Sequence, residues 1–215
     1  MKEDIIRKIE EKKIIAIIRG LDTETAVKTA VALKKGGIEL VEVTFNQKCP
    51  DKFSETADSI AAIKLQCRGV SVGAGTVLTT KQVDIALKAG AEFIISPDAD
   101  EKVIRYTAEN GLVSIPGAYT ATEIKKAYNA GADFVKIFPC LDGAPKYIKA
   151  IRAPLSHIKL LAVGGVNADN AADFIKAGAS GVGVGSSLVN KEWIKSGEYD
   201  KLTSLAEKFV KNVEQ

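Results

Sequence analysis

Histidine is almost absent from the sequence, because His157 is the only one among 215 residues. A single histidine cannot assemble a catalytic zinc site of the three-histidine kind. His157 also precedes an apolar run rather than following one, so we expect it on the stability face of the fold, away from Cys140. Without a histidine beside it, Cys140 is interpreted as filling space and not as a nucleophile. We therefore expect no metal and no cofactor.

Cysteine is scarce as well, and its spacing excludes a disulfide framework. Cys49, Cys67 and Cys140 form no CxxC pair, and their odd number leaves one over. This usage favours free thiols in a reducing cytoplasm. The first 13 residues mix both charge signs and lack the apolar core of a signal peptide. No apolar run approaches the roughly 20 residues that cross a bilayer, so we expect a cytoplasmic protein without a membrane partner.

An excess of one charge is also missing, with 30 basic against 27 acidic residues and a net charge of +3. Nothing in this balance demands nucleic acid as a partner. No stretch rich in proline, glycine and serine interrupts the chain, and its composition does not shift along its length. We therefore expect a single domain over residues 1–215, a length sufficient to bury a large core.

Short apolar runs alternate with longer amphipathic stretches along the whole chain. Each run has four or five residues and is rich in Val, Ile or Phe, which is typical of parallel strands buried on both faces. The eight expected strands are Ile14–Ile18, Leu40–Thr44, Val70–Ala74, Phe93–Ser96, Val113–Pro116, Phe134–Phe138, Lys159–Val163 and Gly181–Val184.

Helical patterns separate these runs. They include Glu24–Lys35, Lys81–Lys88, Asp100–Glu109, Ala121–Asn129 and Asp169–Lys176, with a leading helix over Lys2–Lys12 and a closing one over Lys201–Val213. Eight strand–helix units of this order most naturally close into a barrel, so the predicted fold is an α/β (β/α)₈ TIM barrel with an extra N-terminal helix. A doubly wound open sheet is the main competitor, but it usually has five or six strands.

Lys136 lies in the apolar segment Phe134-Val-Lys-Ile-Phe138. Burying a charged lysine there costs several kcal/mol before compensation. Burial lowers the pKa of a lysine and so supplies a neutral, nucleophilic amine near pH 7. The structural alternative is a lysine that pairs with a carboxylate or extends its ammonium to solvent.

Glu42 is a second lone charge, within Leu40-Val-Glu-Val-Thr44. The second and sixth strands contribute to the same interior layer of a barrel, so Glu42 and Lys136 can face one another. Glu42 could then move protons, or it could form an ion pair that raises the pKa of Lys136. Arg19, at the end of the first strand, could offset this pair, bind a substrate carboxylate, or lie on the surface.

Glycine-rich turns follow several of the expected strands. Gly73-Ala-Gly75-Thr76 after the third strand is a weak motif that a tight turn alone would explain. Gly164-Gly165 after the seventh strand and Gly185-Ser186 after the eighth are more specific. Bare backbone amides at these two loops are the usual phosphate cradle of phosphate-binding barrels. We therefore expect a phosphorylated ligand.

The order Gly73-Ala-Gly-Thr-Val77, Ile115-Pro-Gly117, Lys136-Ile-Phe-Pro139 and Val163-Gly-Gly-Val166, with Glu42 upstream, resembles the 2-keto-3-deoxy-6-phosphogluconate (KDPG) aldolase family. This family includes the 4-hydroxy-2-oxoglutarate (KHG) and 2-keto-3-deoxy-6-phosphogalactonate aldolases, and the resemblance runs from about Ile14 to Val210. It implies a class I aldolase, usually a homotrimer, that acts on a phosphorylated keto acid without a metal.

The resemblance also implies a role for each site residue. Lys136 would form the Schiff base and Glu42 would be the general acid and base. Thr76 and Arg19 would hold the pyruvyl part of the substrate. The phosphate would be bound by Gly164, Gly165, Gly185 and Ser186. The expected reaction cleaves KDPG to pyruvate and glyceraldehyde 3-phosphate, or 4-hydroxy-2-oxoglutarate to pyruvate and glyoxylate.

Two departures from the family pattern leave the substrate epimer open. Phosphogluconate-type members usually have arginine where this chain has Asn46. Asparagine there is similar to the galactonate branch, while Thr44 is similar to the gluconate branch. Asp98 likewise replaces a usual glycine. The galactonate substrate is thus one alternative. Broader alternatives are another enzyme of the phosphate-binding barrel group, which would need no amine nucleophile, and a non-catalytic phosphosugar-binding protein.

Overall fold

The computed structural model describes residues 2–140 and 143–214 of the chain. Its parallel strands are β1 (Ile14–Ile18), β2 (Leu40–Thr44), β3 (Ser71–Gly75), β4 (Phe93–Ile95), β5 (Val113–Ile115), β6 (Gly117–Ala118), β7 (Val135–Ile137), β8 (Leu160–Val163) and β9 (Gly181–Val184). The helices are α1 (Lys2–Lys12), α2 (Thr23–Lys35), the short 3₁₀ helix η1 (Pro50–Lys52), α3 (Phe53–Gln66), α4 (Thr80–Ala89), α5 (Glu101–Glu109), α6 (Ala121–Asn129), α7 (Ala144–Arg152), α8 (Ala171–Lys176), α9 (Lys191–Lys195) and α10 (Tyr199–Val213).

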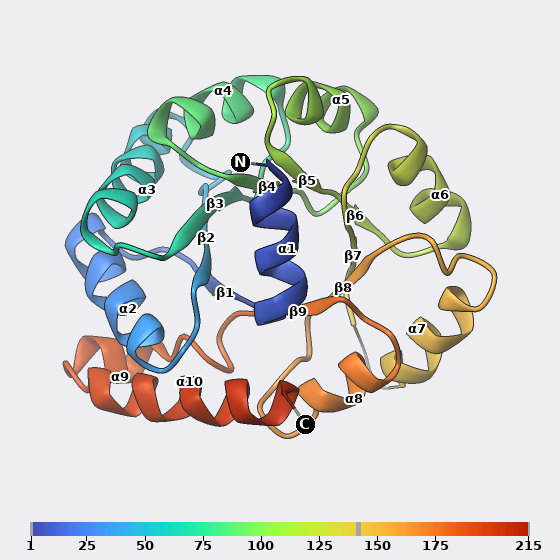
Figure 1. Ribbon diagram of the computed structural model, residues 1–215. Coiled ribbons are helices and arrows are strands. Elements are labelled where there is room, and N and C mark those ends of the chain that lie inside the picture. The colour runs from blue at the N-terminus through green and yellow to red at the C-terminus, as the bar shows by residue number, and fades with distance from the viewer. Residues whose placement is uncertain (1, 141–142, 215) are drawn as a thin grey trace.

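The strands form one sheet in the order β5-β4-β3-β2-β1-β9-β8-β7-β6. The two ends of this order, β5 and β6, are separated in the chain by Pro116 alone, and β6 directly follows the fifth expected strand, which ended at Pro116. Pro116 has no N–H to donate to a ladder, but its carbonyl accepts a hydrogen bond from Lys136 N at 2.8 Å. The sheet therefore closes into a barrel surrounded by helices (Figure 1), which confirms the predicted fold and excludes the open doubly wound sheet.

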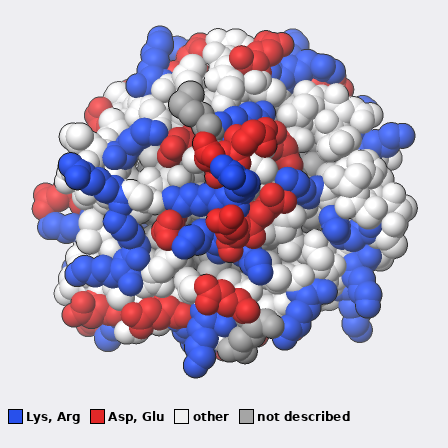
Figure 2. Space-filling model, in the orientation of Figure 1, with Lys and Arg blue, Asp and Glu red and all other residues white. Residues whose placement is uncertain are grey.

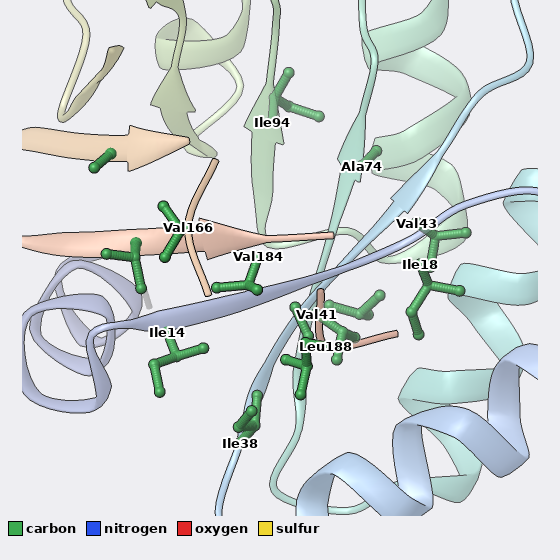
Figure 3. Packing of buried hydrophobic residues seen from close by; sticks show 14 of the residues in the cluster. Ile14, Ile18, Ile38, Val41, Val43, Ala74, Ile94, Val166, Val184 and Leu188 are labelled. Atoms are coloured by element: carbon green, nitrogen blue, oxygen red, sulfur yellow. The ribbon is translucent and has the colours of Figure 1, made fainter. Parts of the chain in front are cut away.

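Alternate residues of each strand face opposite sides of the barrel wall. On β1, Ile14 and Ile18 belong to the core between the strands and the outer helices, whereas Ile15 belongs to a separate interior core. Figure 3 shows the outer core, in which Val41, Val43 and Val184 pack with Ile14 and Ile18. The same alternation points Val135 and Ile137 of β7 outward, so Lys136 between them faces the interior.

The interior core is closed at one end by α1. Ile5, Ile6 and Ile9 of this helix cluster with strand residues such as Leu40 and Phe134. In Figure 1, α1 lies across the barrel opening, at the end where the strands begin. The outer side of α1 carries mixed charges (Figure 2), among them ion pairs from Lys12 to Glu39 and from Lys159 to Glu10. The predicted leading helix is thus a plug, and it leaves the opposite end of the barrel open for a site.

The structure moves two expected boundaries. β3 ends at Gly75 and not at the expected Ala74, so the Gly73–Gly75 segment lies inside the strand, whereas the sequence predicts this segment as a turn after the strand. The reason is packing, because a Cβ on Gly73 would lie 2.1 Å from the ring of Phe93, and one on Gly75 would lie 1.8 Å from Glu42 Oε1. The fifth strand is split at Pro116. The structure also adds α3, α7 and α9, which are absent from the expected helices.

Candidate active site

All eight residues that the sequence nominates line one cavity of about 450 Å³ at the carboxyl ends of the strands. They are Arg19, Glu42, Thr76, Lys136, Gly164, Gly165, Gly185 and Ser186. They come from six strands or the loops that follow them, and only the closed barrel brings these segments together. This end of a barrel is where active sites of the fold lie.

Lys136 projects from β7 into this cavity and is only 8% exposed. Burial lowers the pKa of its ammonium below the ordinary lysine value, and the nearby charge of Arg19 acts in the same direction. The carboxylate of Glu42 opposes both effects but does not overcome the burial. The Nζ atom of Lys136 lies 4.6 Å from the centroid of the Phe138 ring, so the amine contacts the face of a partly exposed aromatic ring in the cavity.

Glu42 lies on β2 and is 2% exposed. Burial raises the pKa of its carboxyl group, against the lowering effect of Lys136 and then Arg19. Its Oε2 atom is buried and has no hydrogen-bond partner among the described residues. Within the same part of the chain, no ion pair within 4.0 Å joins Glu42 to Lys136. A carboxyl group with a raised pKa and an oxygen without a partner is suited to exchange a proton with a ligand.

The loop after β3 is held by two glutamines that the sequence analysis did not identify. Gln47 Nε2 donates to the carbonyl oxygen of Thr76 at 2.6 Å, and Gln82 Nε2 donates to Gln47 Oε1 at 3.2 Å. Gln82 Oε1 in turn accepts from Leu78 N at 2.9 Å. The signal that could have found Gln82 is its place in the first turn of α4, three residues after the N-cap Thr79. The network fixes the backbone of Thr76 at the cavity wall.

At the two positions after β8, Gly164 and Gly165, the backbone conformation and the space available favour glycine over any other residue. Gly164 and Gly165 have φ values of +95° and +67°, a left-handed conformation that side chains rarely adopt. A Cβ on Gly165 would also lie 2.5 Å from the carbonyl oxygen of Cys140. Beside them, Ser187 Oγ donates to the carbonyl oxygen of Val166 at 2.5 Å, which ties the loop after β9 to the loop after β8. The two loops therefore form one continuous backbone surface of the cavity.

Arg19 follows β1 and is exposed at the mouth. It lines the catalytic cavity and also two neighbouring ones, a cavity of about 600 Å³ beside Asn46 and Thr76 and one of about 390 Å³ beside Ser186. Its charge acts on both buried groups, because it lowers the pKa of Lys136 and of Glu42. Of the alternatives that the sequence leaves open, the structure thus places Arg19 at the site and not on a remote surface.

The structure gives no catalytic role to the two residues set aside in the sequence analysis, His157 and Cys140. His157 is exposed and packs edge-on against Tyr128, with ring centroids 5.1 Å apart. Burial raises the pKa of the Cys140 thiol to about 11, so little thiolate forms near neutral pH. Residues 2–140 and 143–214 contain no group of three or more His, Cys, Asp or Glu residues that could hold a metal ion. The helices of the same residues include none that is long and apolar enough to cross a membrane.

Comparison with known proteins gives a consistent result. Residues 5–205 match the family model described as KDPG and KHG aldolase. A probable 2-dehydro-3-deoxy-6-phosphogalactonate aldolase of Rhizobium meliloti is 40% identical over 83% of this chain and 82% of its own length. A 2-dehydro-3-deoxy-phosphogluconate aldolase of Treponema pallidum is 33% identical over 97% of each chain.

Among solved structures, KDPG aldolase from Legionella pneumophila, with pyruvate captured as a covalent carbinolamine, has a TM-score of 0.82. It is 25% identical, and the match covers 96% of this chain and 97% of that one. The fold, the family model and the relatives agree, so neither a non-catalytic phosphosugar-binding protein nor an unrelated enzyme of the barrel group remains as an alternative. The chain belongs to the KDPG and KHG aldolase family and is an aldolase, a carbon–carbon lyase.

Proposed function

We propose that this aldolase cleaves 2-keto-3-deoxy-6-phosphogluconate to pyruvate and glyceraldehyde 3-phosphate through a Schiff base on Lys136. It would also cleave 4-hydroxy-2-oxoglutarate to pyruvate and glyoxylate. The observation that carries the proposal is the amine of Lys136, which burial shifts toward its neutral form at the wall of an open cavity. The captured pyruvate of the Legionella relative is the kind of intermediate that such an amine forms.

The proposed reaction begins when the neutral Nζ of Lys136 adds to the C2 carbonyl of the substrate. Glu42, in its neutral form, protonates the hydroxyl group of the resulting carbinolamine, which leaves as water and gives a protonated imine. Glu42, as a carboxylate, then takes the proton of the C4 hydroxyl. The C3–C4 bond breaks, its electron pair moves into the imine to form an enamine, and the aldehyde leaves. Glu42 returns its proton to C3 of the enamine, and water releases pyruvate and restores the lysine.

The remaining cavity residues hold the substrate in this proposal. Arg19 and Thr76 lie beside Glu42 and would bind the carboxylate of the pyruvyl half, for which the planar guanidinium is suited. Gly164, Gly165, Gly185 and Ser186 would bind the phosphate through backbone amides and a hydroxyl group. We further propose that the protein is a cytoplasmic homotrimer.

Covalent capture tests the chemistry. The protein is incubated with pyruvate and sodium borohydride, digested, and analysed by mass spectrometry. We expect a reduced pyruvyl adduct on Lys136, which Lys136→Met abolishes and Lys149→Met, an exposed control in α7, leaves unchanged. Full activity after treatment with EDTA is expected as well. An unmodified Lys136, or activity that requires an added divalent metal, would contradict the proposal.

The galactonate epimer is a second candidate substrate. Two observations favour it, namely Asn46 at the wall of the cavity next to Thr76 and the 40% identity with the Rhizobium relative. The two substrates differ only in configuration at C4. The ratio of kcat/KM for the purified epimers decides between them, and a ratio above one for the gluconate epimer is the expected result.

A further inference from the structure

A second cavity, of about 390 Å³, lies next to the catalytic one, between β9 and α9. It shares Arg19, Gly185 and Ser186 with the catalytic cavity, so the two are continuous at the loop after β9. Lys191 and Glu192, at the start of α9, line only the second cavity. A ligand group held at Gly185 and Ser186 therefore lies in a cavity that Lys191 also lines.

The charges in the catalytic cavity do not match those of the proposed substrate. Its basic residues are Arg19 and Lys136, and Lys136 must be uncharged when it attacks the carbonyl group. A phosphate monoester carries about −1.5 to −2 charges at pH 7, and the substrate has a carboxylate in addition. One guanidinium group thus faces two anionic groups at opposite ends of the substrate. A further cation near the phosphate loops would correct this imbalance.

Lys191 is placed to supply that cation. A Cβ built on Gly20 would lie 3.5 Å from Lys191 Nζ, so the ammonium group sits beside the residue that follows Arg19. In the part of the chain that the structure describes, Lys191 has no carboxylate partner. Lys52, which lines the cavity of about 600 Å³ with Arg19, is by contrast paired with Glu55 at 3.2 Å. An unpaired ammonium at the wall of a ligand cavity is free to bind an incoming anion.

We propose that Lys191 binds the phosphate group of the substrate and so strengthens the binding of phosphorylated over unphosphorylated 2-keto acids. The inference rests on the proposed function, and it concerns affinity for the phosphate and not the chemistry at Lys136. Arg19 then remains available for the carboxylate of the pyruvyl half. Glu192 lines the same cavity and opposes the phosphate, so its removal strengthens binding.

Variants of α9 test the assignment. For Lys191→Met we expect KM for 2-keto-3-deoxy-6-phosphogluconate to rise roughly tenfold or more, as for the loss of one charge-assisted hydrogen bond, with kcat nearly unchanged. Competitive inhibition by inorganic phosphate weakens in parallel. Lys191→Arg retains most of the affinity, and Glu192→Gln lowers KM. Lys195→Met, at the other end of the same exposed helix, leaves KM unchanged.

Borohydride capture of pyruvate, which carries no phosphate, is the second measurement. We expect Lys191→Met to capture pyruvate at the rate of the unaltered protein. An unchanged KM in Lys191→Met, or an equal loss of pyruvate capture and of cleavage, would overturn the assignment. If the unaltered protein captures no pyruvate, the Schiff-base proposal fails instead. Calorimetry with inorganic phosphate then still decides whether Lys191→Met binds the anion more weakly.

Discussion

At the scale of single residues, burial moves the pKa values of Lys136 and Glu42 in opposite directions, and both directions favour the neutral forms. A neutral amine is a nucleophile, whereas a neutral carboxyl group is an acid that must first lose its proton to act as a base. The two groups share an apolar interior without a direct ion pair among the described residues. Burial therefore makes the site reactive, because it disfavours both the ammonium form of Lys136 and the carboxylate form of Glu42.

Glu42→Gln separates two roles of the carboxyl group, namely proton transfer during cleavage and its effect on the pKa of Lys136. We expect cleavage to slow by roughly 10²–10⁴-fold, the usual contribution of an acid–base group. Glu42 raises the pKa of Lys136, so its neutralisation should lower that pKa further, and pyruvate capture should persist at lower pH. A capture profile shifted to higher pH would contradict this coupling.

The same substitution is expected to stabilise the protein. A carboxyl group whose pKa is raised on folding weakens the folded state as the pH increases above the ordinary value of 4.5, because the unfolded chain loses its proton first. Glu42→Gln removes this cost, so the free energy of unfolding at pH 8 should increase by roughly 0.5–2 kcal/mol. The gain should be smaller at pH 5. Urea denaturation at the two pH values measures it, and a gain that is larger at pH 5 would refute the explanation.

Arg19→Met tests the cation at the mouth. Because Arg19 lowers the pKa values of both Lys136 and Glu42, its removal should raise both. Pyruvate capture should then require a higher pH than in the unaltered protein. KM should also rise roughly tenfold or more if the guanidinium binds the carboxylate. Lys48→Met, which removes a cation from the neighbouring cavity, is the matched control. An equal effect of both substitutions would show that the pKa values respond to the overall charge of the protein and not to Arg19 in particular.

At the scale of elements, two glycines in strand β3 make room for side chains of the adjacent strands, Gly73 for Phe93 of the interior core and Gly75 for Glu42 of the site. Gly75→Ala would place a Cβ 1.8 Å from Glu42 Oε1, so we expect a loss of roughly 1–3 kcal/mol in stability together with a loss of activity. Gly185→Ala meets no atom within 4 Å and should fold as stably as the unaltered chain. Thermal unfolding of the two variants checks the contrast, and equal stability of both would contradict the packing argument.

The elements also show what the sequence could predict. Eight apolar runs predicted the barrel strands, and the isolated charges of Lys136 and Glu42 marked the site, because a charge in an apolar strand has few structural explanations. The split at Pro116 and the place of Gly75 inside β3 depend on contacts with Lys136 and Glu42 from other strands. The glutamine network around Thr76 likewise joins two loops. Such contacts across the barrel leave no periodic signal along the chain.

At the scale of the whole molecule, α1 closes one end of the barrel and the site occupies the other (Figure 1). Ile9 is fully buried in the interior core, whereas the ion pairs around α1 are partly exposed and individually weak. Ile9→Ala should cost roughly 2–5 kcal/mol of stability, and Lys12→Met less than about 1 kcal/mol. Both should keep kcat while folded, since α1 lies away from the cavity. A loss of stability in Lys12→Met larger than that in Ile9→Ala would show that ion pairs, rather than packing, hold α1 against the barrel.

The central claim is that the folded barrel keeps the amine of Lys136 uncharged at a pH where free lysine is an ammonium ion. Nuclear magnetic resonance of protein labelled in its lysine side chains measures this, with Lys136 identified by the signal that Lys136→Met lacks. We predict a titration midpoint below the ordinary value of 10.5. A midpoint at or above that value would contradict the account.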